Sequence, residues 1–298
     1  MRVKLHGVRG SRPTHKNSLL GYGGNSTSIQ FLLPGKDFEL YLDGGSGLAH
    51  HGLRLGSQTK NRKFYFLVTH THWDHMIGYP FFAPLYNPNN EFVFYTSSPL
   101  EKDSFEKLFY GQLAKGHLPF PRDLVKAKIE IKLIKPGEKL VIDTDVHVST
   151  YQLNHQGITL GFRVEYQGES AAVITDNAPI ENGNHLGEHW KELAKDNSAQ
   201  FEKDFNDGLV RFLHRCNTVI FDTHFTEENL KADWGHSTPH RATKFCSDAQ
   251  VGRLILFHHA PEDTDQAVAD KVTSVINIGK SAGLEVVAAR EGDEWPAK

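Results

Sequence analysis

The sequence predicts an α+β protein in which two mixed β-sheets pack face to face and helices cover both outer faces. Several short segments within residues 2–42 and 129–175 are rich in β-branched and aromatic residues, a pattern typical of strands. Between residues 185 and 288, helical segments alternate with strand-like segments, as in sheets that contain parallel strands. No low-complexity linker divides the 298 residues, so we expect a single domain over residues 1–298.

In the first half of the chain, the expected strands are short and separated by turn signals. Pro34-Gly35 predicts one of these turns. Ser104–Ala114 has a pattern that favours a helix. The expected strands are Arg2–Val8, Thr27–Leu33, Phe38–Leu42, Phe64–Val68 and Phe92–Tyr95.

In the second half, a stretch dense in strands gives way to alternating helices and strands. Pro136-Gly137 and Gln167-Gly168 predict turns. Helices are expected over His185–Leu213, near Pro239–Ser247 and near Asp263–Ala282, where Val268, Val272 and Val275 recur at helical spacing. The expected strands are Ile129–Ile134, Lys139–Ile142, Val146–Leu153, Thr159–Tyr166, Ala171–Thr175, Thr218–Phe221, Arg253–Phe257 and Leu284–Ala288.

The composition is typical of a globular protein from a reducing compartment. Apolar residues make up 39% of the chain and charged residues 23%. The net charge of −3, without a long basic run, gives no electrostatic support for strong non-specific binding of nucleic acid. The two cysteines, Cys216 and Cys246, provide no disulfide framework. Because the sequence shows neither a signal peptide nor a run of 18 apolar residues, we expect a cytoplasmic protein without a membrane span.

A cluster of metal-binding residue types follows the expected strand Phe64–Val68. His70, His72, Asp74 and His75 stand within six residues, and neutral imidazole and carboxylate suit a divalent cation such as zinc. His70 and His72 are two residues apart, so both can point into one cleft from an extended segment. Asp74 and His75, past the turn, can reach a second point nearby. The cluster therefore predicts two adjacent metal ions, which usually indicate hydrolysis.

Three other expected strands end in residues of the same types, namely His155, Asp176 and His258. Unrelated residues would not be expected to repeat the same arrangement at the ends of three strands. The repetition therefore favours metal ligands over structural residues. A carboxylate such as Asp176 can bridge two ions. His259 is the alternative to His258, which comes first after its strand. We assign His70, His72 and His155 to one ion, Asp74, His75 and His258 to the other, and Asp176 to both.

Two further motifs offer residues for supporting roles. Asp43 precedes two glycines at a strand end, and it either caps a turn or orients a ligand histidine, the role we assign to it. Asp222 and His236 could form an acid–imidazole pair that donates a proton to a leaving-group oxygen. Alternatively, His236 precedes and caps the helix that starts at Pro239. The candidate catalytic residues are Asp74, Asp222 and His236.

The segment His70-Thr71-His72-Trp73-Asp74-His75 resembles the H-x-H-x-D-H signature of the metallo-β-lactamase superfamily. Asp43, His155, Asp176 and His258 resemble its other motifs in the same order, and the resemblance covers about residues 1–290. It implies a four-layer αββα sandwich, the metallo-β-lactamase fold, with a dinuclear site along one edge of the sheets. The metal ligands it implies are the ones assigned above.

The Asp222 and His236 pair resembles the carboxylate–histidine dyad of the phosphodiesterase branch of that superfamily, which includes ribonuclease Z and cyclic phosphodiesterases. Val8–Pro13 and Tyr22–Ser26 also resemble this branch. Arg9, in the first of these segments, and Asn25, in the second, are therefore candidates for binding phosphate or base, with a turn-structuring role as the alternative.

The sequence departs from ribonuclease Z in the segment that grips the tRNA substrate. Ribonuclease Z carries a tRNA-gripping arm between the motifs equivalent to His155 and Asp176. Only twenty residues separate the two here, and two expected strands occupy most of them. A long arm cannot fit, so tRNA processing is not expected.

These observations predict a dinuclear metal-dependent phosphodiesterase that acts on cyclic nucleotides or other small phosphodiesters through a metal-bound hydroxide. Zinc is the favoured metal, with manganese and iron as alternatives. The competing hypotheses are a carboxyl-ester, lactone or thioester hydrolase at the same ions and a non-catalytic binding or sensor module. We expect no membrane and no large nucleic acid as partner, while a homodimer and the role of residues 185–213 stay open.

Overall fold

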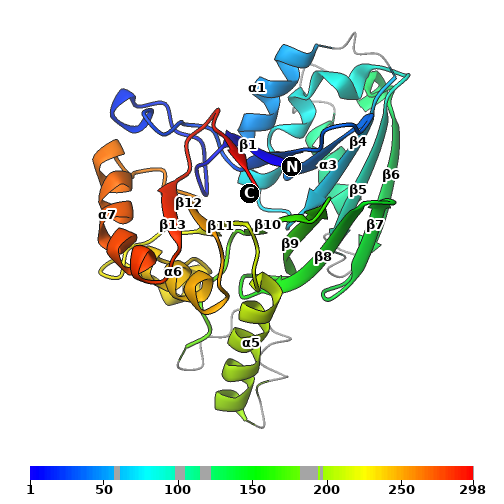
Figure 1. Ribbon diagram of the computed structural model, residues 1–298. Helices are drawn as coiled ribbons and strands as arrows, with labels where there is room; N and C mark the ends of the chain where they lie inside the picture. Colours follow the sequence, from blue (N-terminus) through cyan, green and yellow to red (C-terminus); the bar gives the residue numbers. More distant parts are fainter. Residues whose placement is uncertain (57–60, 98–104, 115–121, 182–193, 195–196, 298) are drawn as a thin grey trace. The chain divides into compact units, whose positions relative to one another are not determined.

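The computed structural model describes residues 1–56, 61–97, 105–114, 122–181, 194 and 197–297 of the chain (Figure 1). These residues form two compact units. Unit 1 consists of Met1–Lys135 together with Arg290–Pro296, and unit 2 is built from Pro136–Ala289. The expected helix over His185–Leu213 and the expected helix from Ser104 lie partly outside the described residues.

Unit 1 contains a seven-stranded mixed sheet with the strand order β14-β1-β2-β3-β4-β5-β6. Neighbours from β14 to β3 pair antiparallel, and neighbours from β3 to β6 pair parallel. The strands are β1 (Arg2–Gly7), β2 (Ser28–Leu32), β3 (Phe38–Leu42), β4 (Lys63–Val68), β5 (Glu91–Ser97), β6 (Lys128–Ile134) and β14 (Glu294–Pro296).

The helices of unit 1 pack on one face of this sheet through an aromatic core. Alternate residues of β4 and β5, such as Phe66 and Phe94, point to that face because side chains alternate along a strand. The rings of Phe66 and Phe94 stack with centroids 5.1 Å apart. The helical elements are α1 (Ser46–Leu55), α2 (Trp73–Met76), α3 (Phe105–Gln112), and the 3₁₀ helices η1 (Asn17–Leu19), η2 (Tyr79–Phe81), η3 (Ala83–Tyr86) and η4 (Arg122–Leu124).

Unit 2 contains a second seven-stranded mixed sheet, ordered β13-β12-β11-β10-β9-β8-β7. Neighbours from β13 to β10 pair parallel, and neighbours from β10 to β7 pair antiparallel. The strands are β7 (Lys139–Asp143), β8 (Val146–Leu153), β9 (Thr159–Tyr166), β10 (Glu169–Ile174), β11 (Thr218–Asp222), β12 (Arg253–Phe257) and β13 (Glu285–Ala288).

Three helices cover a face of the unit 2 sheet, and α6 and α7 pack against each other there (Figure 1). Phe221 and Leu256, from the parallel strands, share a buried cluster with Leu209, Ala242 and Val275, one from each helix. The helices are α5 (Ser198–Leu213), α6 (Pro239–Asp248) and α7 (Asp265–Ser281), and η5 (Ala232–Trp234) precedes α6. No helix among the described residues has both the length and the apolar character needed to cross a membrane.

Among the described α-helices and strands, three are additional to those that the sequence predicted: α1, α2 and β14. Helix α1 escaped prediction because Gly47 and Gly52 lower its helix propensity. Both glycines serve close packing, since a Cβ on Gly47 would lie 2.2 Å from the His6 carbonyl oxygen and one on Gly52 would lie 2.6 Å from the Phe82 ring. Strand β14 is only three residues long, too short for a periodicity to appear.

Candidate functional site

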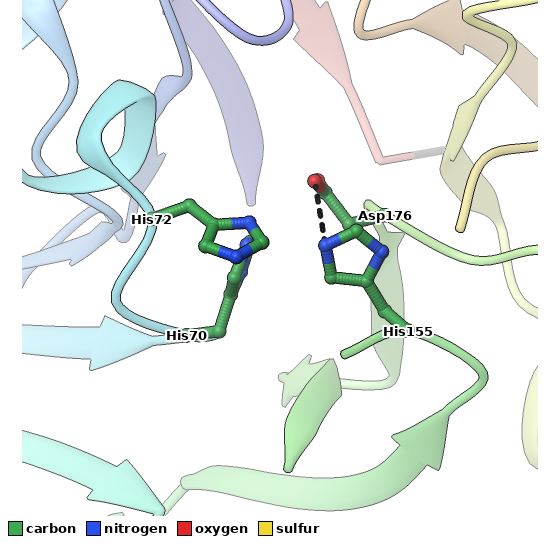
Figure 2. Close-up of side chains that lie close together, drawn as sticks. All are labelled: His70, His72, His155 and Asp176. Atoms are coloured by element: carbon green, nitrogen blue, oxygen red, sulfur yellow. Dashed lines mark ion pairs between the residues drawn. The ribbon is translucent and has the colours of Figure 1, made fainter. Parts of the chain in front are cut away.

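Unit 1 presents four of the predicted ligands directly after β4. The chain leaves β4 on extended backbone and then forms α2, a single turn for which His72 is the N-cap residue. His70 and His72 therefore precede the turn, and Asp74 and His75 lie on it (Figure 2 labels the first two). The His70 ring centroid lies 4.5 Å from that of His72 and 4.2 Å from that of His75. All but His72 are buried.

Asp43 orients this segment from the end of β3. Its Oδ2 lies 2.7 Å from His75 Nδ1, and its carboxylate also accepts hydrogen bonds from the backbone N–H and the hydroxyl of Thr69 at 2.8 and 2.7 Å. Burial raises the pKa of Asp43, while His75 and Thr69 act in the opposite direction. Asp43 thus contacts His75, one of the predicted ligand histidines.

The N-terminal loop reaches Asp74. Ser11 donates its backbone N–H to Asp74 Oδ2 at 2.8 Å, and the same carboxylate oxygen lies 3.2 Å from His75 Nε2. This contact links the segment around Ser11 to the ligand motif. It acts through the backbone rather than through a side chain.

Arg9 and Asn25, the two predicted substrate-binding residues, are held by the protein itself. Arg9 is fully buried, and its guanidinium donates to the carbonyl oxygens of Gly23, at 2.8 Å, and Leu19. The Asn25 amide donates to Glu291 Oε1 at 2.5 Å, and its oxygen accepts from the Ser46 hydroxyl at 2.9 Å. These contacts favour the turn-structuring role that the sequence left open.

Unit 2 brings together its three predicted ligands at the ends of different strands. Asp176 follows β10, and its Oδ1 lies 3.2 Å from Nε2 of His258, which follows β12. Its Oδ2 lies 3.6 Å from Nε2 of His155, and Figure 2 shows this pair joined by a dashed line. His259 instead directs Nε2 to the carbonyl oxygen of Ala289 at 3.0 Å, so the geometry favours His258 over its neighbour.

Asp222 and His236 form the expected pair. Asp222 Oδ2 lies 2.9 Å from His236 Nδ1, and both side chains are buried. Helix α6 is capped by Thr238, whose hydroxyl accepts the backbone N–H of Arg241, so His236 is not the N-cap residue. Burial opposes ionisation of Asp222, but the charge of His236 and the hydrogen bond from it lower the pKa of this carboxyl below its ordinary value.

The backbone is strained at three of these positions. Asp43, Asp176 and His258 have φ values of 56°, 53° and 58°, in the left-handed region that ordinary residues seldom adopt. Each follows a strand that pairs in parallel with a neighbouring strand. Such outliers often mark functional sites, because the surrounding structure must offset their cost.

Two residues near the dyad were missed by the sequence reasoning. The buried ring of His224 stacks on His236 with centroids 4.5 Å apart, and burial lowers its pKa to about 3. The ammonium of Lys271, in α7, donates to the carbonyl oxygens of Thr223 and His224 at 2.7 Å and to Asp263 at 2.6 Å. For Lys271 the sequence offers one signal, because a lysine stands on the apolar face of the expected helix.

The residues of each unit fit a divalent cation. His75 and His155 direct Nδ1 to the Asp43 carboxylate and to the Gly235 carbonyl oxygen, at 2.7 and 3.1 Å. A proton on Nδ1 leaves a lone pair on Nε2, and metal-binding histidines are commonly oriented by such a partner. In both cases Nε2 lies beside a carboxylate of the predicted ligand set. Imidazole with carboxylate is a donor set that zinc, manganese and iron accept.

Sequence comparison finds relatives named ribonuclease Z. The enzyme of Lactobacillus delbrueckii subsp. bulgaricus is 24% identical over 269 residues, which cover 78% of this chain and 82% of the relative. That of Latilactobacillus sakei subsp. sakei is 22% identical over 290 residues, covering 86% and 88%. No protein-family model matches the chain.

Solved structures resemble the chain over its whole length. The metallo-β-lactamase fold protein YhfI from Bacillus subtilis has a TM-score of 0.68 and 15% identity, and the match covers 99% of this chain and 98% of YhfI. The chain has the metallo-β-lactamase fold. The short form of human tRNase Z has a TM-score of 0.66 and 15% identity over 100% of both chains. A diphosphatase of the PhnP family has a TM-score of 0.63 and 15% identity over 99% of this chain and 97% of that one.

These matches confirm two predictions from the sequence. The α+β class, with two mixed sheets and accompanying helices, is that of the metallo-β-lactamase fold. The predicted resemblance to the phosphodiesterase branch agrees with the ribonuclease Z relatives and with the tRNase Z and diphosphatase structures. Fold, relatives and buried histidine–aspartate groups together support a metal-dependent hydrolase of the phosphodiesterase type.

Proposed function

We propose that this metallo-β-lactamase-fold protein is a dinuclear phosphodiesterase of small phosphodiesters, with cyclic nucleotides as the favoured substrates. The observation that carries the proposal is the buried Asp222–His236 pair in the same unit as three predicted metal ligands. An ester, lactone or thioester releases its leaving group without such a proton donor more readily than an alkyl phosphodiester does. The pair therefore favours phosphodiesters over those substrates.

In this proposal the predicted ligands bind two metal ions, as the superfamily resemblance implies. When bound, two divalent ions would lower the pKa of a bound water and would offset the negative charge on phosphate oxygens. Zinc is favoured, with manganese and iron as alternatives. The ligands are His70, His72 and His155 for one ion, Asp74, His75 and His258 for the other, and Asp176 for both.

His236 supplies the proton for the leaving alkoxide. Asp222 holds Nδ1 of His236, so Nε2 is the atom that would pass a proton to the leaving oxygen. The backbone N–H groups of His224 and Asn177 also donate to the Asp222 carboxylate, at 2.9 and 3.2 Å. These bonds fix the carboxylate, so that the imidazole has one orientation relative to the ligands of unit 2.

The short segment between His155 and Asp176 favours a small substrate over tRNA. Strands β9 and β10 fill most of this interval, and the turn between them consists of Gln167 and Gly168 alone. The position at which ribonuclease Z carries its tRNA-gripping arm thus holds only a short hairpin. The net charge of −3 also gives little attraction for a polyanion.

A substrate panel tests the proposal. The purified protein would be assayed with zinc, manganese or iron(II) against cyclic nucleotides, bis-p-nitrophenyl phosphate, a precursor tRNA, a lactone and a thioester. We expect metal-dependent hydrolysis of the small phosphodiesters, and we expect Asp176→Asn to lose both activity and bound metal. The exposed Asp37→Asn serves as the matched control. A protein that hydrolyses the lactone or thioester with a higher kcat/KM than any phosphodiester would overturn the proposal.

A further inference from the structure

A cavity of about 820 Å³ lies within unit 1 beside the ligand segment. It is lined by residues of α2, η2 and α3, including Trp73, Met76 and Phe81, and its lining is largely apolar. This volume is in the range of pockets that hold small organic ligands. Trp73 and Phe81 have exposed fractions of 69% and 40%, so they offer aromatic surface to a ligand.

Residues that line the cavity alternate along the sequence with the predicted metal ligands. Thr71, which lines it, stands between His70 and His72, and Trp73 stands between His72 and Asp74. Helix α2 is a single turn, so it directs Asp74 and His75 inward, where they are buried, while Trp73 stays exposed at the cavity. The cavity therefore lies beside the segment that carries His70, His72 and Asp74.

We propose that this cavity binds the base of a nucleotide substrate, with the base stacked on Trp73. The inference rests on the proposed function and specifies its substrate class. A nucleobase is flat, largely apolar on its faces and polar at its edge, and it is joined to the phosphate through one sugar. Stacking on an exposed tryptophan suits its faces, and the Thr71 hydroxyl and the Gln112 amide offer hydrogen bonds to its edge.

Charge in the cavity is consistent with a nucleotide. Among the described residues of the lining, Lys107 in α3 carries the only formal charge. A single ammonium at the edge of an apolar pocket favours a ligand that combines an apolar body with an anionic group. A wholly apolar ligand, such as an acyl chain, would gain nothing from it.

Gly111 allows a test that leaves every ligand and Trp73 in place. It lies in α3 and lines the cavity, and a Cβ built on it meets no described atom within 4 Å. Gly111→Phe would therefore add a ring at the lining of the cavity. Glu106→Phe is the matched control, because it adds the same ring to an exposed position of α3 outside the cavity lining.

Two substrates of one chemical class provide the readout. KM would be measured for a 2′,3′-cyclic nucleotide and for glycerol 1,2-cyclic phosphate, which has no base. We expect Gly111→Phe to raise the ratio of the two KM values by about tenfold or more, and Glu106→Phe to leave that ratio as in the parent protein. An unchanged ratio in Gly111→Phe would overturn the pocket assignment while leaving the proposed phosphodiesterase intact.

A binding measurement tests the pocket without catalysis. Adenosine 5′-monophosphate would be titrated into the metal-free protein while tryptophan fluorescence is recorded. We expect saturable quenching that is lost in Trp73→Phe and weakened in Gly111→Phe. Quenching with no hydrolysis of any phosphodiester would support the pocket and reject the proposed function, whereas the same quenching in parent protein and Trp73→Phe would reject the pocket.

Discussion

Asp222 determines how His236 is presented. The carboxylate is fully buried at the end of β11, and it accepts backbone N–H groups from three segments: Asn177, His224 and Ser237. Besides these three backbone groups, the Asp222 carboxylate contacts His236 Nδ1. His236 lowers the pKa of Asp222, which favours the carboxylate, and the carboxylate in turn stabilises the imidazolium form that can donate a proton.

Replacing His236 should produce a loss that depends on the leaving group. We expect His236→Ala to lower kcat about 10²- to 10⁴-fold for a cyclic nucleotide, whose leaving alkoxide needs a proton. For bis-p-nitrophenyl phosphate the loss should be much smaller, because p-nitrophenolate leaves unprotonated. Steady-state kinetics on both substrates measure the two losses.

The exposed His240 on α6 provides the control for that experiment. His240→Ala should match the parent protein on both substrates, since its side chain lies outside the buried group of His224, His236 and His258. Equal losses on the two substrates in His236→Ala would show that His236 has a structural role and is not a proton donor.

Residue identities at the site could be predicted from the sequence, but their geometry could not. Strand ends are visible in the hydrophobic pattern, so His155, Asp176 and His258 stand out as polar residues after apolar runs. The left-handed backbone at Asp176 and His258 leaves no such pattern, because it follows from tertiary packing. The same holds for Arg9, whose guanidinium is held by the loop carbonyl oxygens of Leu19 and Gly23.

At the scale of elements, helix α7 anchors the loop that carries His224. Lys271 is buried, and its ammonium bridges the loop carbonyl oxygens of Thr223 and His224 to the carboxylate of Asp263. The loop begins immediately after Asp222. The position of the dyad therefore depends on a helix whose own side chains lie outside the predicted ligand set.

Removing this anchor should affect both stability and activity. We expect Lys271→Met to lower the free energy of unfolding by about 3 kcal/mol, because two carbonyl oxygens and a carboxylate lose their buried partner. Urea denaturation measures the change. Lys280→Met, at an exposed position of the same helix, is the matched control and should change stability by less than about 0.5 kcal/mol. A comparable loss in both variants would contradict the anchoring role.

Helices and strands could be predicted where a long segment shows a periodic hydrophobic pattern. They were missed where tertiary packing overrides the local conformational preference. Helix α7 shows its apolar face at helical spacing, so its position follows from the sequence. Helix α1 contains glycines that local propensity disfavours, and its close approach to the His6 carbonyl requires Gly47.

At the scale of the whole molecule, the two units share one layout. Each contains a seven-stranded sheet in which one half pairs antiparallel and the other parallel. In each unit the parallel half supplies predicted ligand residues after its strands: His70 after β4 in unit 1, and Asp176 and His258 in unit 2. Polar groups at the carboxyl ends of parallel strands are a recurrent way to build a site. The sequence shows no strong repeat, so this correspondence emerges only from the strand order.

Acid should destabilise the folded protein through two histidines of unit 1, the buried His6 and the half-buried His51. The rings of His6 and His51 stack 4.0 Å apart, and burial lowers their pKa values to about 4 and about 3. Both are neutral when folded and bind protons on unfolding below pH 6.5, so stability falls as pH drops from there, by about 1.4 kcal/mol per pH unit for each. Urea denaturation between pH 7.5 and 5 measures this slope. His51→Gln should reduce it and the exposed His147→Gln should not; equal slopes in both variants would assign the acid sensitivity to other groups.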